Sequence, residues 1–439
     1  MRSAEKTAIY NLIQRIPPAR HRRLLRERVA FTLLIAFVLA TLAPSASRAA
    51  PAPAPVAPVY ATAAQLTATP DTTVFALTLT RGVTAEVFTI DNPYRVIVDL
   101  PDVAFKLPPG TGEKPSGHVK VFRYGLFAER KARVVIETTG PVSVASAIME
   151  RQGGKGAVVL KIALQTTDAS AFVASMAKPD ADRDETGAQS VPGPQPEPGG
   201  SGAKQRPVIV IDPGHGGIDP GAVGKAVAEK DIVFAVSRHV ADLLRKSGGY
   251  DVRLTRTSDV FVSLDKRLKL SSDFRADLFI SLHADSISET QFAESVRGAT
   301  VYTLSEQASD EQSRLMAEKE NASDLIAGLS WGGEEGSDEV RDILFDLMQR
   351  ETSNFSADFS QLLVTGLTKN IVMSRDPQRS AAFKVLKQAH APSVLVELGY
   401  MSNSKDQREM MTTDWQLKVA GAIKAAVDQY FTKRTAVQR

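Results

Sequence analysis

The sequence predicts an α/β domain, with a central and mostly parallel sheet flanked by helices, preceded by a small all-β domain. Two patterns carry this prediction. Residues 64–166 alternate apolar and polar side chains in the two-residue period of β-strands, with turn residues between the runs. From residue 207 onward, short continuous apolar runs alternate with helical patterns, as expected for a sheet covered on both faces. A stretch rich in proline and glycine separates the two regions.

The first 49 residues have the composition of a cleavable export signal. Five arginines between residues 20 and 28 form a cationic segment, and residues 29–42 are an uncharged apolar run of 14 residues. Residues 43–49 offer the small side chains that a signal peptidase requires. Because the apolar run is short for a bilayer about 30 Å thick, we expect cleavage, and an uncleaved anchor is the alternative. Arg22 and Arg23 loosely resemble a twin-arginine signal, which leaves the export route open.

The net charge of the protein depends on whether this segment is removed. The 439 residues carry a net charge of +3, but residues 1–49 contribute nine Lys or Arg against two acids. Removing that net +7 from +3 leaves a mildly acidic chain of −4. Nucleic-acid binding, which depends on neutralising phosphates, is therefore not expected. The chain has no cysteine, so any metal must be held by histidines and carboxylates.

Composition divides the remainder into four parts. Residues 50–63, rich in proline and alanine, are expected to form an extended leader. Residues 64–166 form the predicted β domain, in which the single histidine, His118, gives no indication of catalysis. Residues 167–206 contain too few apolar side chains to fold and are expected to be a disordered linker. Residues 207–433 form the predicted α/β domain.

Within the α/β domain, the order of strands and helices follows from the apolar pattern. Three continuous apolar runs predict buried strands, at residues 208–211, 278–282 and 393–396. Glu229–Lys246 carries apolar residues on one helical face and is followed by Gly248, which predicts a helix and its end. Trp415–Phe431 is expected to close the domain as an amphipathic helix.

Two histidines and two glutamates fall at one edge of the predicted sheet. His215 and His283 follow the carboxyl ends of two buried strands, Glu397 ends a third, and Glu229 opens the first helix. Ligands of open α/β sheets bind at this edge. Two imidazoles and one carboxylate, with a fourth position open, form a common catalytic zinc site. The remaining carboxylate would then accept a proton from water.

Each of these four positions alone has an ordinary structural explanation, because histidine is common in glycine-rich turns and strand-end glutamates often cap or pair. Their occurrence together at one edge favours a metal site. The other histidines give weaker indications. His21 lies in the export segment, His239 is interpreted as a core or boundary residue of its helix, and His390 stays undecided.

The same residues carry a resemblance to a known family. Val208–Phe431 resembles the zinc-dependent N-acetylmuramoyl-L-alanine amidases of the Amidase_3 type. Four motifs occur in the family's order, and they are Ile211–Gly217, Glu229–Lys230, Ser281–Asp285 and Val396–Asn403. The resemblance implies that His215, Glu229 and His283 bind Zn²⁺ and that Glu397 is the catalytic glutamate. It also implies hydrolysis of the amide bond that joins N-acetylmuramic acid to the first L-alanine of the peptidoglycan stem peptide.

Two further segments resemble parts of such amidases. Residues 64–166 resemble the AMIN domain, which implies placement on the cell wall, notably at division sites. An insertion at about residues 305–340 resembles the division-associated subgroup, in which a helix covers the zinc site until a partner with a LytM-like domain withdraws it. Glu318 or Glu320 is the candidate carboxylate for the open metal position, and a solvated surface helix is the alternative for each.

Together these observations predict a monomeric, periplasmic zinc amidase that acts on peptidoglycan in daughter-cell separation, is autoinhibited by the inserted helix and has no nucleic-acid partner. Two other functions stay open. One is a wall-binding protein with an inert catalytic domain, and the other is a zinc deacetylase or peptidase that cleaves another bond of the wall. The product released from the wall distinguishes them.

Overall fold

The computed structural model describes residues 58–152, 156–175, 206–224, 226–286, 294–329, 339–388 and 390–437. The predicted export segment and residues 176–205 of the predicted linker lie outside these residues. In the part of the chain that is described, no helix is both long enough and apolar enough to cross a membrane.

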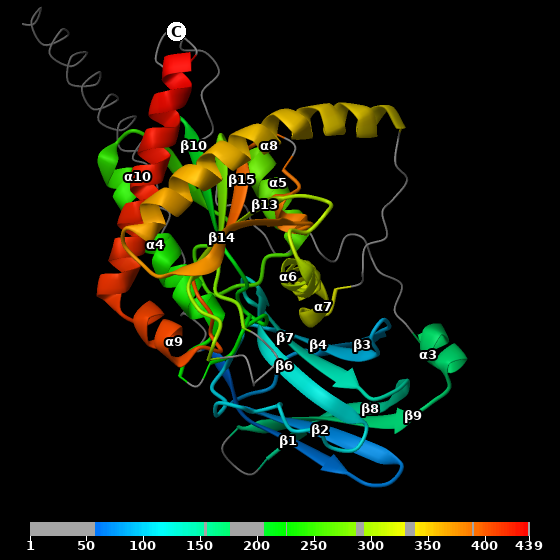
Figure 1. Cartoon of the computed structure of the whole chain (residues 1–439). Helices are drawn as coiled ribbons and strands as arrows, with labels where there is room; N and C mark the ends of the chain where they lie inside the picture. The colour runs from blue at the N-terminus through cyan, green and yellow to red at the C-terminus, as the bar shows by residue number, and fades with distance from the viewer. Residues whose placement is uncertain are drawn as a thin grey trace, which may run out of the picture. The chain divides into compact units, whose positions relative to one another are not determined.

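The N-terminal domain consists of two mainly antiparallel sheets, which Figure 1 shows in colours from blue through cyan to blue-green. One sheet has the strand order β5-β1-β2-β9-β8 and the other β3-β4-β7-β6. The strands are β1 (Val59–Ala68), β2 (Thr72–Leu79), β3 (Glu86–Ile90), β4 (Arg95–Pro101), β5 (Val103–Phe105), β6 (Val119–Ala128), β7 (Lys131–Thr138), β8 (Val142–Arg151) and β9 (Val158–Thr166). The prediction of an all-β domain is confirmed.

Alternation along the strands sends one set of side chains into the space between the two sheets. In β2, Phe75, Leu77 and Leu79 are fully buried, and they share one apolar cluster with Val96 and Val98 of β4. The opposite face of β4 and β7 is also buried, by a separate apolar cluster that includes residues far away in the sequence. Both faces of this sheet are therefore covered.

The boundaries of the β domain differ from the predicted ones. Strand β1 begins at Val59, inside the segment expected to be a leader, because Val59 and Ala61 are buried between β2 and β5. At the other end, the helix α3 (Ala169–Ser175) occupies the start of the expected linker. Its Phe172 is fully buried and packs edge-on against Tyr94, with ring centroids 4.9 Å apart. Val59 and Ala61 at one end and Phe172 at the other are too few apolar residues to predict these contacts from the sequence.

The C-terminal domain has a six-stranded sheet with the order β11-β10-β12-β15-β13-β14. Neighbouring strands run parallel except β13 and β15, which are antiparallel. The strands are β10 (Val208–Pro213), β11 (Asp251–Leu254), β12 (Leu278–His283), β13 (Ala299–Leu304), β14 (Met373–Ala381) and β15 (Ser393–Glu397). The predicted mostly parallel sheet is confirmed, with its three central strands at the expected positions.

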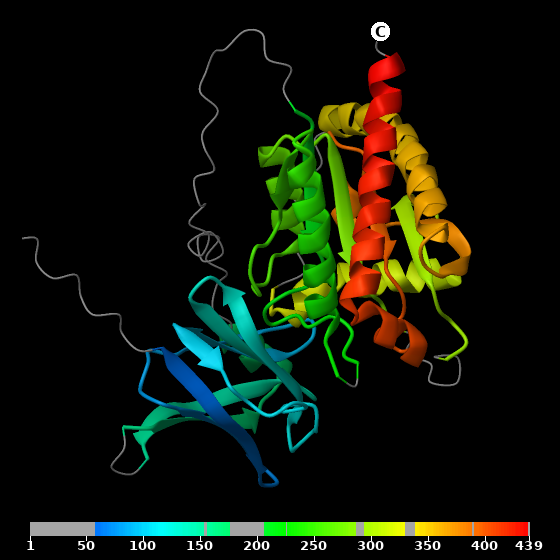
Figure 2. The ribbon, with the colours of Figure 1, turned by 90° about the vertical axis from the view of Figure 1, so that its left-hand side faces the viewer.

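Helices cover both faces of this sheet because successive residues of each strand point to opposite sides. Ile209 and Ile211 pack in a cluster with α4, α8 and α10, and Figure 2 shows these helices along one side of the sheet. Val210 packs on the other side, in a cluster with α5, α6 and η2. The helices are α4 (Glu229–Ser247), α5 (Leu264–Asp273), α6 (Glu311–Asn321), α7 (Ser323–Ile326), α8 (Glu339–Thr368), η2 (Lys384–Leu386), α9 (Ser404–Met410) and α10 (Thr413–Val437).

A buried ion pair fixes the loop that leaves β10. Asp212, fully buried, accepts hydrogen bonds from Arg267 Nη1 at 2.6 Å, from Thr255 Oγ1 at 2.5 Å and from Ser281 Oγ at 2.7 Å. Arg267 also donates to the carbonyl oxygen of His215 at 2.9 Å. The burial of Asp212 raises the pKa of its carboxyl, but Arg267 and the two hydroxyls outweigh burial and lower it. The conformation of the loop therefore depends on the ion pair between Asp212 and Arg267, and removal of either side chain would leave the other charge buried without a partner.

Replacing Arg267 with methionine should destabilise the α/β domain by about 3–5 kcal/mol, because the charge of Asp212 is left buried without its partner. Urea unfolding followed by tryptophan fluorescence measures this, since both tryptophans, Trp331 and Trp415, lie in this domain's sequence. Arg253→Met, which removes a half-exposed ion pair, should change the free energy of unfolding by less than about 1 kcal/mol. Equal stability of the two variants would contradict the role given to Arg267.

Candidate metal centre

The first residue of the cluster, His215, lies in the loop after β10 with a positive φ of 56°. It is 5% exposed. The preceding residue has to be glycine, because a Cβ on Gly214 would lie 2.5 Å from the ring of His283. The absence of a side chain at Gly214 allows the two imidazoles to lie close together, with ring centroids 4.8 Å apart.

Asp219 fixes the orientation of the His215 ring. Its Oδ2 lies 2.7 Å from His215 Nδ1, and its Oδ1 accepts a hydrogen bond from the backbone N–H of Gly221 at 3.0 Å. With a proton on Nδ1, the lone pair of His215 is on Nε2, which suits a metal ligand. Metal-binding histidines commonly have such a carboxylate partner. Asp219 was not among the residues predicted from the sequence, where its four-residue spacing from His215 was the available indication.

Glu229 and His283 complete the group. Glu229 is the first residue of α4 and is fully buried. Backbone N–H groups fix both of its oxygens, since Ala284 donates to Oε1 and Ala222 donates to Oε2, each at 2.8 Å. His283 is the last residue of β12 and is 6% exposed. The predicted convergence of strand ends and the helix start at one sheet edge is therefore present.

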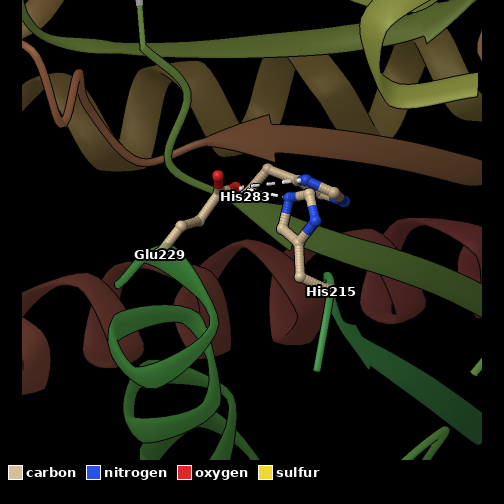
Figure 3. Close-up of side chains that lie close together, drawn as sticks. All are labelled: His215, Glu229 and His283. Carbon is tan, nitrogen blue, oxygen red and sulfur yellow. Dashed lines mark ion pairs between the residues drawn. The ribbon is translucent and has the colours of Figure 1, made fainter. Parts of the chain in front are cut away.

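Figure 3 shows the side chains of His215, Glu229 and His283 directed toward one another, from a loop, a helix start and a strand end. Glu229 Oε1 lies 3.0 Å from His215 Nε2 and 3.3 Å from His283 Nδ1. The three ligand atoms all lie within 4.8 Å of one another. In a tetrahedral site with bonds of about 2.0–2.1 Å, ligand atoms are about 3.3–3.4 Å apart. The two distances from Glu229 Oε1 are close to this spacing, so the three residues could hold one metal ion.

The two facing nitrogens give a second indication of a metal. Within the described residues, His215 Nε2 and His283 Nδ1 are buried, and although carboxylate oxygens lie 3.0–3.3 Å from them, neither nitrogen makes a hydrogen bond of good geometry. Buried polar atoms without a partner are rare in folded proteins. A cation that both nitrogens coordinate would account for them, and the two histidines with Glu229 would be its protein ligands.

A fourth side chain, Glu320, reaches the same point from α6. Its Oε2 lies 3.3 Å from His215 Nε2 and 3.2 Å from His283 Nδ1, and the residue is 5% exposed. Glu318, the other candidate, is exposed on the opposite side of α6 and pairs with Arg314. The structure thus brings Glu320 into the cluster and leaves Glu318 in solvent, where the alternative of a solvated helix position applies.

Carboxylates dominate the charge around the two imidazoles. Burial alone lowers the pKa of His283, but Glu320 and Glu229 outweigh it and raise this pKa to about 10. Burial has the same effect on His215, whose pKa is nevertheless raised well above the usual value by Asp219, Glu229 and Glu320. The cluster therefore attracts positive charge, which a divalent cation supplies.

Glu397 lies beside the cluster at the end of β15, paired in the sheet with His283. It is fully buried. Its Oε2 accepts a hydrogen bond from the backbone N–H of Asp285 at 2.8 Å, whereas Oε1 has no hydrogen-bond partner among the described residues. Burial, followed by the charge of Asp285, raises the pKa of Glu397 well above its usual value. A carboxyl group with a raised pKa is a stronger base, which suits a proton acceptor.

Helix α6 covers the cluster at this edge of the sheet. Its Met316 and Ala317 are buried in the apolar cluster on that side of the sheet, and Lys319 bonds to the carboxylate of Asp285. At its end, Asn321 Nδ2 donates to the carbonyl oxygen of Ala382 at 2.8 Å. The cavity left beside His215, His283 and Glu320 has a volume of about 10 Å³, enough for about one water molecule.

The other histidines of the described residues lie elsewhere. His118 is in the β domain, His239 is half-buried on α4 and His390 is exposed. The position of His239 agrees with its interpretation as a boundary residue. None of the three is a member of the group that could hold a metal.

Comparison with known proteins identifies both domains. Residues 209–429 match the family model described as N-acetylmuramoyl-L-alanine amidase, and residues 63–160 match the AMIN domain. The chain is 33% identical to the N-acetylmuramoyl-L-alanine amidase AmiC of Escherichia coli O6:H1 over 80% of this chain and 85% of that protein. It is 27% identical to AmiC of Neisseria meningitidis serogroup B over 93% and 97% of the two chains. The chain belongs to the N-acetylmuramoyl-L-alanine amidase family and carries an N-terminal AMIN domain.

Proposed function

We propose that this protein is a zinc-dependent amidase that cleaves the bond between the lactyl group of N-acetylmuramic acid and the first L-alanine of the stem peptide in peptidoglycan. The observation that carries the proposal is the buried group of His215, Glu229 and His283 with Glu397 beside it. Two imidazoles and one carboxylate are a frequent ligand set of catalytic zinc. Membership of the family supports the choice of substrate.

In the proposed mechanism, Glu397 moves the proton. A bound zinc ion would polarise the scissile carbonyl and lower the pKa of the attacking water. The backbone N–H of Asp285 holds Oε2 of Glu397, which leaves Oε1 to accept the proton of that water. The raised pKa of Glu397 suits the next step, in which the protonated carboxyl donates to the departing amine nitrogen of L-alanine.

The protein is autoinhibited in this proposal. Glu320 lies at the position that substrate and water would need, and the cavity beside it has room for about one water molecule. Helix α6, which we call the blocking helix, has to move before a stem peptide can enter. The resemblance to the division-associated subgroup supports a partner with a LytM-like domain as the activator that moves it.

The proposed cellular role rests on the first 49 residues and on the AMIN domain. The composition of residues 1–49 supports export and a periplasmic location. The AMIN domain would place the monomeric enzyme on the wall, and the family resemblance supports a role in daughter-cell separation.

Digestion of purified sacculi tests the reaction itself. The zinc-loaded protein, as wild type and with Glu320→Ala, should release unsubstituted glycan strands and peptides with a free N-terminal L-alanine, as detected by mass spectrometry. A chelator should stop the release, and added Zn²⁺ should restore it, because the ligand set depends on the metal. Release of acetate, or of peptides cut at their cross-links, would instead support the deacetylase or peptidase alternative.

Replacing Glu397 with glutamine should lower turnover about 100-fold or more while zinc stays bound, because the amide cannot accept a proton. Amide release and metal content, measured on the same preparation, separate the two effects. Glu409→Gln, the same change on the surface of α9, is the matched control and should keep full activity. Wild-type turnover of the Glu397 variant would remove this residue from the mechanism.

Replacing Glu320 with alanine should raise activity without any partner by about tenfold or more, because the blocking carboxylate is lost. Glu318→Ala makes the same change two residues earlier on the exposed side of α6 and should leave activity at the wild-type level. Amide release from sacculi in the absence of an activator measures both. Activity of the Glu320 variant equal to or below that of the wild type would contradict autoinhibition by this residue.

A further inference from the structure

The chain that follows the blocking helix lies on the β domain. Residues 323–329, which we call the anchor segment, comprise α7 and three residues after it. They begin three residues after Glu320. Ala327 is fully buried in the apolar cluster formed with Ile97 of β4 and Val135 of β7, on the face of that sheet turned away from the other sheet.

Arg95 of β4 donates hydrogen bonds to two backbone carbonyl groups of the anchor segment. Its Nη1 donates to the carbonyl oxygen of Leu325 at 2.5 Å and to that of Leu329 at 3.2 Å. The same guanidinium donates within the β domain to the carbonyl oxygens of Pro93 and Asp91, at 3.0 and 2.9 Å. Arg95 is 2% exposed, and burial lowers its pKa to about 10. The cationic group is thus held largely by carbonyl oxygens, and two of them belong to the anchor segment.

Arg133 of β7 binds the middle of the anchor segment. Its Nη1 donates to the carbonyl oxygen of Ala327 at 3.0 Å, while Nε and Nη2 donate to Asp99 at 2.6 and 2.9 Å. The guanidinium lies 3.5 Å from the ring centroid of Phe127. Carbonyl groups at the end of a helix lack intrahelical partners, and a cation there satisfies them. Two arginines on neighbouring strands therefore bind three carbonyl oxygens of one short segment.

The backbone of the anchor segment fits this face closely. Gly328 has a φ of +76°, and a Cβ at this position would lie 2.5 Å from Ile97 Cδ1 and 3.1 Å from Val135 Cγ2. Only glycine allows this approach without displacing the segment. The fit between Gly328 and the two apolar side chains is therefore a second, independent contact besides the arginine bonds.

The β domain also contacts the loop that carries His215. The carbonyl oxygen of Leu126 accepts hydrogen bonds from the backbone N–H groups of Ile218 and Phe261, each at 3.2 Å. Phe127 stacks on Phe261, with ring centroids 5.8 Å apart. Ile218 lies between His215 and Asp219 in the sequence. One domain is thus bonded both to the metal-binding loop and to the chain that follows the blocking helix.

We propose that this face of the AMIN domain, formed by Arg95, Ile97, Arg133 and Val135, is an intramolecular binding site for the anchor segment and that it keeps the blocking helix closed. The proposal rests on the autoinhibition proposed above. Because the anchor segment begins three residues after Glu320, movement of the blocking helix away from the cluster would also displace the anchor segment. Opening of the site therefore requires the hydrogen bonds to both arginines to break. The AMIN domain then has a regulatory function besides its place on the wall.

Two substitutions in the full-length protein test this site. Arg95→Met removes the bonds from the side of the AMIN domain, and Gly328→Val displaces the anchor segment without altering that domain's own residues. Each should raise activator-free amide release about tenfold, because stabilisation of the closed state is lost. Each should also speed amide hydrogen exchange in peptides that cover residues 311–329. Arg130→Met, which removes an exposed arginine of the same domain, is the control and should match the wild type in both measurements.

Combination with Glu320→Ala separates this proposal from the autoinhibition on which it rests. If the anchor acts through Glu320, Gly328→Val should add less than about twofold to the activity of Glu320→Ala, because two changes in one path are not additive. Glu320→Ala could raise activity while Arg95→Met and Gly328→Val behave as wild type in activity and exchange. In that case the proposed binding site for the anchor segment is wrong and the proposed autoinhibition stands. If Glu320→Ala has no effect on activity, autoinhibition fails. The exchange measurement then still decides whether the AMIN domain holds the segment, and wild-type exchange in Gly328→Val overturns it even if Arg95→Met does not fold.

Discussion

The candidate centre depends on how the carboxylate of Glu229 is held. Both of its oxygens accept backbone N–H groups, one from the chain after β10 and one from the residue after β12. Those bonds direct Oε1 between His215 and His283, which come from the same two strands. The start of a helix favours a negative charge at this position. A single glutamate thus connects β10, α4 and β12, and the rest of the site is arranged around it.

The sequence predicted the four central residues because each follows a strong local pattern. His215, His283 and Glu397 stand at the ends of apolar runs, Glu229 opens an amphipathic helix, and parallel strands bring such positions to one edge. The mostly parallel sheet was predicted on the same grounds.

Contacts that leave no periodic pattern could not be predicted in this way. Choosing Glu320 over Glu318 requires the rotation of α6 about its axis, which tertiary packing sets. Asp219 depends on the course of an irregular loop, and the bonds of Arg95 reach backbone carbonyls about 230 residues away. Backbone acceptors have no side-chain identity, so the sequence around residue 325 gives no indication that an arginine binds there.

The position of Glu320 on the same chain as the histidines has a consequence for how such an enzyme would be controlled. A tethered carboxylate competes with substrate at a high effective concentration, typically in the millimolar range for short linkers, whatever the amount of enzyme present. Under the proposed autoinhibition, a weak metal contact would be sufficient to keep the centre closed, and nothing would have to be cut or chemically modified to open it. After dissociation of the proposed activator, the chain would return to the closed conformation, so each period of wall cleavage would end without removal of the enzyme.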